Sequence, residues 1–146
     1  MFRGATGLSI DSKGRMTVPS KHRAALTKLV IAPNPMPNEC CLVVYPLDEW
    51  EAVEKNIVSQ PNTKAIRRLK RIFIGEAVEY VVDAQGRVLI TPELREYAGL
   101  DKKITLVGQG NKLEIWSDAA WTALHDSVDD KDAQAQYVET LEGLSF

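Results

Sequence analysis

The chain has 146 residues, of which 45% are hydrophobic, so it can bury a core without disulfides or a structural metal. That length fits one domain or two small intertwined halves. No apolar run approaches the roughly 18 residues that a membrane-spanning helix needs, and the N-terminus lacks the apolar region of a signal peptide. We therefore expect a cytoplasmic protein that does not contact a membrane.

The charge is distributed unevenly along the chain, although the formal net charge is only −2. Residues 1–72 hold twelve Lys and Arg against six Asp and Glu, whereas residues 73–146 hold six against fourteen. The two halves therefore carry net charges of +6 and −8. Because attraction to phosphate depends on the local surface, the overall acidity does not exclude a nucleic-acid partner.

In chain order, the first predicted elements are two short strands around a tight turn. The segments "GLSID" and "RMTVP" alternate apolar and polar residues on either side of SKG. Asp11 can accept hydrogen bonds from turn amides, and Gly14 can supply the positive φ of a turn. The pattern returns 72 residues later in "YVVDAQGRVLITP", with Asp83 and Gly86 in the corresponding places. We expect a hairpin at each copy.

The repetition extends beyond the turns. Each copy is followed by a short helical pattern, "SKHRAALTKL" or "PELREYAGL", in which Arg23 corresponds to Arg95. A strand follows, "CLVVYP" or "KLEIWS", and then the start of a helix. Such a unit of about 72 residues indicates an internal repeat. Pro33, Pro35 and Pro37 predict a loop inside the first unit.

A basic helix is predicted between the two units, in "TKAIRRLKRIFIG". Its apolar residues share one face and leave the basic residues off that face. Arg67, Arg68 and Arg71 are compatible with contact to DNA, with pairing to the acidic tail of a neighbouring chain, or with exposure to solvent. The last twenty residues, 127–146, are acidic and sparsely apolar, which fits a peripheral helix or a frayed tail. The three tryptophans, at helix or strand spacings, indicate core or interface packing: Trp50, Trp116 and Trp121.

No catalytic or metal-binding constellation is visible. Cys40 and Cys41 are adjacent in a predicted buried strand, and His22 and His125 lie at no metal-ligand spacing to them. No histidine, cysteine or serine constellation accompanies the turn aspartates, and no glycine-rich phosphate loop is present. We expect packing thiols, no metal, no cofactor, no small-molecule substrate and no enzyme activity.

The duplicated turn is the candidate functional feature. Two related halves can interleave into one pseudo-symmetric barrel that hides the edges of both and places both turns in equivalent surface positions. The guanidinium groups of Arg15 and Arg87 suit phosphate or the O6 and N7 atoms of guanine, and Lys13 adds a positive charge. A single turn of this kind is also compatible with a hairpin whose arginine is merely solvated.

The segments "MFRGATGLSIDSKGRMTVPSKHRAAL", "DAQGRVLITPELREYAGL" and "LVGQGNKLEIWS" resemble the MraZ family of bacterial transcriptional regulators, over residues 1–121. The resemblance implies an α+β, β-rich fold in which tandem SpoVT/AbrB-like repeats form a swapped-hairpin β-barrel with short peripheral helices. On that basis we expect repeat 1 at residues 1–56, a connecting basic helix at 57–76, repeat 2 at 77–123 and an acidic tail at 124–146.

The resemblance also implies a function. Family members bind promoter-proximal direct repeats of double-stranded DNA and regulate the division and cell wall gene cluster. We therefore expect a sequence-specific, nucleoid-associated regulator that acts as a repressor and forms a homo-oligomeric ring of eight or twelve chains. The alternative is a protein-interaction module of the same barrel class, similar to an antitoxin, whose tail binds a partner.

The D-x-x-x-R motif that the resemblance associates with DNA binding falls on residues 11–15 and 83–87. Contacts to base edges or phosphates are expected from Arg15 and Arg87, and a phosphate contact from Lys13. Asp11, Gly14, Asp83 and Gly86 are expected to shape the turns, while Arg3 is a weaker candidate. Ala84 and Gln85 replace Ser12 and Lys13 in the second copy, which removes one positive charge. The two turns are therefore expected to contact DNA unequally.

Overall fold

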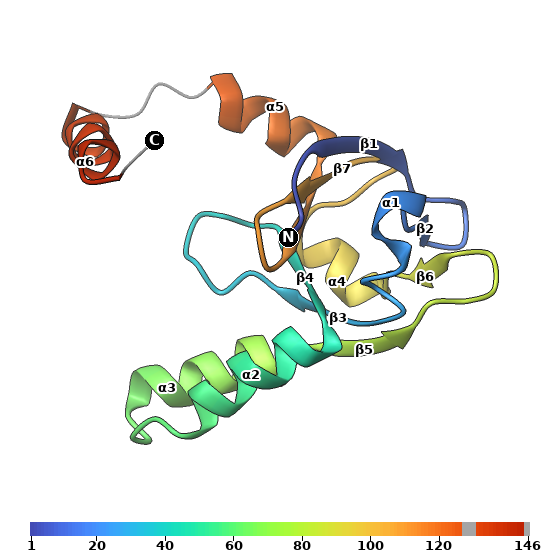
Figure 1. The fold of residues 1–146 in the computed structure, drawn as a ribbon, viewed down its shortest axis with the longest axis horizontal. Coiled ribbons are helices and arrows are strands. Elements are labelled where there is room, and N and C mark those ends of the chain that lie inside the picture. The colour runs from blue at the N-terminus through green and yellow to red at the C-terminus, as the bar shows by residue number, and fades with distance from the viewer. Residues whose placement is uncertain (127–130, 145–146) are drawn as a thin grey trace.

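Eight strands and short helices make up the computed structural model, which describes residues 1–126 and 131–144 (Figure 1). The first half contains β1 (Ala5–Ser9), β2 (Arg15–Thr17), α1 (Ser20–Arg23), β3 (Lys28–Pro33), β4 (Leu42–Pro46), α2 (Leu47–Val58), α3 (Lys64–Leu69) and the π-helical turn η1 (Lys70–Ile74). The second half contains β5 (Val78–Val81), β6 (Arg87–Leu89), α4 (Pro92–Tyr97), β7 (Lys103–Gly108), β8 (Leu113–Ser117), α5 (Asp118–Asp126) and α6 (Lys131–Glu142).

The strands form a six-stranded sheet in the order β1-β7-β8-β4-β3-β5 and a two-stranded ribbon of β2 and β6. All pairings are antiparallel. Four of them join the two halves of the chain: β1 with β7, β2 with β6, β3 with β5, and β4 with β8. The predicted α+β class is confirmed, and the two halves share one sheet.

The strands beside each turn pair with the other half of the chain, so the expectation of two self-paired hairpins is wrong. The first turn is closed by the Asp11 amide, which donates to the Arg15 carbonyl at 3.0 Å. One residue earlier, the Ile10 amide already donates to the carbonyl of Lys102 in the other half, at 2.8 Å. Alternating hydrophobicity predicts a strand and its buried face, but it does not say which strand lies alongside.

The main core is built jointly by the two halves. Met16 lies opposite Val88 in the β2–β6 ribbon, and their exposed fractions are only 1% and 3%. Val18 and Ile90, at 1% and 0%, continue this contact at the ends of the ribbon. Fully burying one such side chain is worth about 1.5–3 kcal/mol. Neither half can gain this burial alone, because the apolar partners come from the other half.

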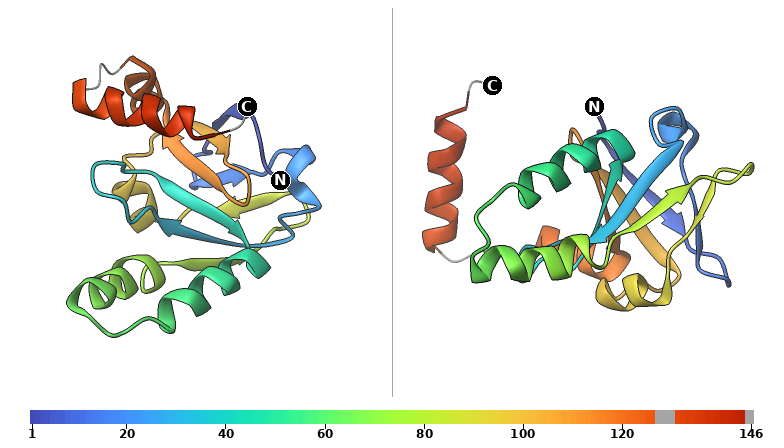
Figure 2. Two further views of the ribbon diagram at one scale, coloured as in Figure 1. Left: turned by 60° about the vertical axis from the view of Figure 1, so that its left-hand side comes forward. Right: turned by 90° about the horizontal axis from the view of Figure 1, so that it is seen from below.

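A second apolar cluster is formed where α2, α3 and η1 pack against β3 and β4. The ring centroids of Trp50 and Phe73 are 4.9 Å apart, and Tyr45 packs edge-on against Trp50 at 5.8 Å. Leu69 is packed against this cluster, so the predicted apolar face of the basic helix is confirmed there. In Figures 1 and 2, α2 and α3 lie together on one side of the strands, and α5 lies on another. The buried Trp116 contacts Trp121 of α5, with centroids 6.5 Å apart.

Two local expectations need correction. Pro33 is the last residue of β3 and pairs with Leu42, so the proline-rich loop begins one residue later than predicted. Proline fits this position because a strand end needs no further amide donor. Both cysteines precede β4, but only Cys41 is buried, and its carbonyl accepts a hydrogen bond from the Asn34 amide at 2.9 Å, whereas Cys40 is exposed.

Of the two alternatives for the acidic tail, the structure shows a helix at Lys131–Glu142, none of whose residues is buried. Residues 127–130 and 145–146 of the predicted tail lie outside the described residues. Within the part of the chain that the structure describes, no helix is both long and apolar enough to cross a bilayer.

Candidate functional site

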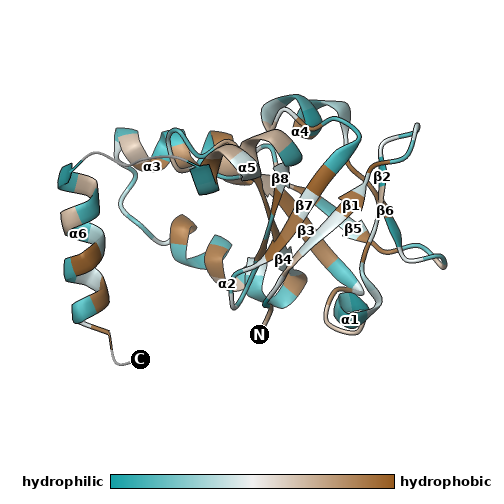
Figure 3. Ribbon diagram, turned by 90° about the horizontal axis from the view of Figure 1, so that it is seen from above, coloured by the Kyte–Doolittle hydropathy of each residue, from teal (hydrophilic) through white to brown (hydrophobic). Residues whose placement is uncertain are grey.

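The two repeated turns project from the same end of the molecule. Figure 1 shows the β1–β2 turn and the β5–β6 turn extending beyond the short β2–β6 ribbon, and Figure 3 shows the same arrangement from above. In the ribbon, Arg15 lies opposite Leu89 and Arg87 lies opposite Thr17. The antiparallel register therefore places the two turns at opposite ends of the ribbon, and the whole ribbon lies at this one end of the molecule.

In the first turn, the Asp11 carboxylate organises the backbone and holds the arginine. Its Oδ1 accepts hydrogen bonds from the amides of Lys13 and Arg15, each at 2.9 Å, and its Oδ2 accepts one from Arg15 Nε at 2.7 Å. Gly14 adopts φ +87° and donates its amide to the Asp11 carbonyl at 2.9 Å. A residue with a side chain is strained at this φ, which explains the glycine.

The second turn repeats this geometry atom for atom. Asp83 Oδ1 accepts from the amides of Gln85 at 2.9 Å and Arg87 at 2.8 Å, and Oδ2 accepts from Arg87 Nε at 3.2 Å. Gly86 adopts φ +79°. The duplicated sequence pattern therefore encodes two equivalent structures.

These contacts fix the charge state of the turns. The backbone hydrogen bond from Arg15 is the largest cause that lowers the pKa of Asp11, and the bond from Arg87 does the same for Asp83. Both carboxylates are thus charged at neutral pH. With Lys13, the first turn carries a net charge of +1, whereas the second turn is neutral. Since the Asp–Arg pairs are exposed, they contribute orientation more than stability.

Each turn arginine uses only one edge of its guanidinium group within the turn. The side chains of Arg15 and Arg87 are 30% and 29% exposed, and each uses Nε for its aspartate. Among residues 1–126 and 131–144, the Nη atoms of both guanidinium groups make no hydrogen bond. A guanidinium oriented in this way offers two parallel N–H donors, the geometry that binds phosphate or a guanine edge.

Sequence reasoning missed two arginines that belong to the turns. A Cβ added at Gly14 would lie 3.0 Å from Cζ of Arg95, and a Cβ added at Gly86 would lie 2.6 Å from Cζ of Arg23. Each of these helix arginines therefore packs against the turn glycine of the other half. Their correspondence between the repeats was visible in the sequence, but the crossing contact depends on the interleaved fold.

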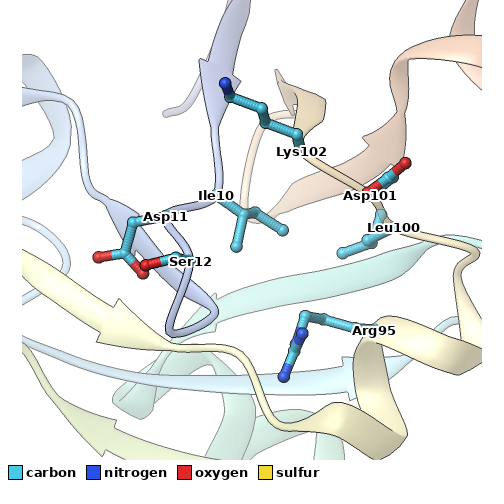
Figure 4. Close-up of a pocket in the computed structure, with 7 residues that line it drawn as sticks. All are labelled: Ile10, Asp11, Ser12, Arg95, Leu100, Asp101 and Lys102. Atoms are coloured by element: carbon cyan, nitrogen blue, oxygen red, sulfur yellow. The ribbon is translucent and has the colours of Figure 1, made fainter.

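A hollow of about 420 Å³ lies behind the first turn (Figure 4). Two basic residues, Arg95 and Lys102, and two acidic residues, Asp11 and Asp101, are among those that line it. A smaller hollow of about 270 Å³ lies behind the second turn, and both Arg23 and Asp83 line it. This mixed lining gives neither hollow a clear preference for a charged ligand. Within the described ranges, no cluster of His, Cys, Asp and Glu is arranged to hold a metal ion.

The basic helix lies away from the turns. Arg67 Nη1 donates to the Asn62 carbonyl at 2.8 Å, and the side chains of α3 and η1 make no ion pair with any residue that the structure describes. Figures 1 and 3 both show α3 at the end of the molecule opposite to the turns. The structure therefore does not bring Arg67, Arg68 and Arg71 into the candidate site.

Comparison with known proteins places this chain in a family. The model of the family described as "MraZ protein, putative antitoxin-like" matches residues 1–72 and again residues 73–141, which confirms the internal repeat. A protein of Thioalkalivibrio sulfidiphilus (strain HL-EbGR7) is 44% identical over 100% of both chains. One of Halorhodospira halophila (strain DSM 244 / SL1) is 46% identical over 83% of this chain and 82% of its own. One of Azoarcus sp. (strain BH72) is 47% identical over 88% of both. All three carry the name "Transcriptional regulator MraZ". The chain belongs to the MraZ family.

Proposed function

We propose that this chain is a sequence-specific DNA-binding transcriptional regulator that contacts double-stranded DNA through its two arginine-bearing turns. The observation that carries the proposal is the pair of equivalent turns at one end of the molecule, each with a guanidinium held by an aspartate. The name of the relatives, "Transcriptional regulator MraZ", supports the same function.

Arg15 and Arg87 are the groups that contact base edges or phosphates. Because the aspartates already hold Nε of each arginine, less side-chain freedom is lost on binding than for a free arginine. Lys13 adds a phosphate contact at the first turn alone, so that turn binds more strongly. Asp11 and Asp83 act within the protein, since a carboxylate that faced phosphate would be repelled. We assign no catalytic step to any of these groups.

Oligomerisation compensates for the weak DNA binding of each turn. Each neutralised phosphate changes log K by only about −0.9 per log unit of salt, so one chain with two turns binds weakly. A homo-oligomeric ring, of eight or twelve chains, that engages direct repeats would raise the overall affinity through effective concentration. We extend the proposal to repression of the division and cell wall gene cluster from such repeats, in a cytoplasmic, nucleoid-associated protein.

We also propose a finer architecture for the chain. The pairing of β1 with β7 and of β2 with β6 supports a swapped-hairpin barrel of two SpoVT/AbrB-like repeats, because each turn is flanked by strands that pair with the other half. In this division, residues 1–56 and 77–123 are the repeats, residues 57–76 connect them, and residues 124–146 form the tail.

Fluorescence anisotropy with a duplex from the chain's own upstream region tests the proposal. We expect a preference over a scrambled duplex that weakens with added salt. A bidentate arginine–base contact is worth about 1–3 kcal/mol of discrimination, so Arg15→Ala should reduce the preference by about fivefold to 150-fold. Lys55→Ala removes an exposed cation on α2 and serves as the matched control. Equal, weak binding to both duplexes, unchanged by Arg15→Ala, would remove DNA recognition from the turns.

The description of the family model as antitoxin-like favours a second candidate, a protein-interaction module whose exposed α6 binds a separate partner. That function predicts a stable complex with another protein and no preference for the native duplex. Duplex preference that survives removal of residues 127–146 would support the DNA-binding regulator instead.

A further inference from the structure

Two arginines outside the D-x-x-x-R motif join the halves of the molecule at the turns. Arg23 Nε donates to the carbonyl of Val18 at 2.9 Å, which fixes the direction of its side chain. The guanidinium then lies against Gly86, where an added Cβ would be 2.6 Å from both Cζ and Nε. Arg23 is in the first half of the chain, but the turn that it touches is in the second half.

The same residue that anchors the arginine also binds the turn. The Val18 amide donates to the Gly86 carbonyl at 2.7 Å, while the Val18 carbonyl accepts from Arg23. Val18 is 1% exposed and therefore rigidly placed in the core. Gly86 is thus held on one side by a backbone hydrogen bond and on the other by a packed guanidinium.

The arrangement occurs a second time with the halves exchanged. Arg95 Nε donates to the Ile90 carbonyl at 3.0 Å, and the Ile90 amide donates to the Gly14 carbonyl at 2.9 Å. An added Cβ at Gly14 would lie 3.0 Å from Arg95 Cζ and 3.1 Å from its Nε. The same contact therefore occurs at both turns, each time between the two halves of the chain.

We propose that Arg23 and Arg95 are positioning residues, each of which holds the DNA-binding turn of the opposite half in place. This inference rests on the proposed function, and it deepens it by naming the groups that keep the two turn arginines in a fixed relation. Lysine cannot replace them, because it has no planar group to lie on the glycine and no Nε donor. A released turn must be ordered again when DNA binds, and that ordering weakens binding by about twofold to tenfold.

Hydrogen exchange on the millisecond scale tests the inference in the full-length chain without DNA. Arg23→Met should speed exchange of the Gln85, Gly86 and Arg87 amides and leave the first turn within twofold of the wild type. Arg95→Met should do the reverse. Arg23→Lys should behave like Arg23→Met, whereas the control Lys55→Met should change neither turn. Circular dichroism confirms that each variant is folded.

DNA binding supplies the second readout. Both arginine variants should lose affinity for the native duplex by about twofold to tenfold, with an unchanged slope of log K against log salt. Faster exchange in the turn of the same half, equal effects on both turns, or no effect would overturn the inference. A slope reduced by about 0.9 would also overturn it, because it would indicate direct phosphate contact. If the two variants affect the turns of the opposite halves but the wild-type chain shows no preference for the native duplex, the proposed function is contradicted and the positioning contacts stand.

Discussion

Replacing Gly86 with alanine should destabilise the protein more than its backbone conformation alone explains. At φ +79°, a residue with a side chain is strained by about 1 kcal/mol. The new methyl group would also lie 2.6 Å from the Arg23 guanidinium, which must move away. That movement breaks the hydrogen bond to Val18, at a further cost of roughly 0.5–1.5 kcal/mol. We expect Gly86→Ala to lower the free energy of unfolding by about 1.5–2.5 kcal/mol.

Gly99 provides the matched control. It also has a positive φ, +60°, but an added Cβ would meet nothing within 4 Å. Gly99→Ala should therefore cost only the conformational part, about 1 kcal/mol. In an Arg23→Met background, Gly86→Ala should cost the same as Gly99→Ala, because the flexible methionine has no hydrogen bond to Val18 to lose when it moves aside.

Urea denaturation followed by circular dichroism measures these differences, at one protein concentration because assembly alters apparent stability. The coupling between Gly86→Ala and Arg23→Met should be about 0.5–1.5 kcal/mol. Additive effects of the two substitutions, or equal costs at Gly86 and Gly99 in the wild-type background, would refute the assigned contact.

Three further predictions concern titration and reactivity. The turn amides lower the pKa values of Asp11 and Asp83, so these carboxylates stabilise the fold above their unfolded pKa of about 3.8, and this stabilisation disappears as pH falls through the lower folded values. Asp11→Asn and Asp83→Asn should make unfolding free energy less dependent on pH below about 4, as measured by urea titration. Burial lowers the pKa of His22, so stability should fall as pH drops below about 6.5, and His22→Gln should flatten that part of the profile. Burial raises the pKa of the Cys41 thiol to about 12, so iodoacetamide at pH 8 should label only Cys40 in the folded chain and both cysteines in urea, as counted by mass spectrometry.

Sequence periodicity predicts much of the local structure because it depends on neighbouring residues. The short strands beside each turn and the apolar face of α3 follow from residues near one another in the chain. Strand partners do not, because β1 meets β7 across about a hundred residues. The hairpins were therefore placed correctly but paired wrongly.

The candidate site likewise contains contacts that a short motif predicts and contacts that depend on the whole fold. Asp11 and Arg15 bind each other within one turn, so their pairing is visible in a five-residue motif. Arg23 and Arg95 touch glycines in the opposite half, and only the interleaved fold brings them there. The cysteines show the limit of a local pattern, since both lie before the strand boundary at Leu42 and only Cys41 is buried.

Hydrogen exchange of the wild-type chain with and without its native duplex tests the central claim most directly. We predict protection of the amides in both turns, 11–15 and 83–87, with stronger protection in the first turn because Lys13 adds a phosphate contact. The basic helix, Lys64–Leu69, should show no change, and a scrambled duplex should protect neither turn to the same extent. Protection of α3 with no change in either turn would contradict the account and move the DNA-binding surface to the other end of the molecule.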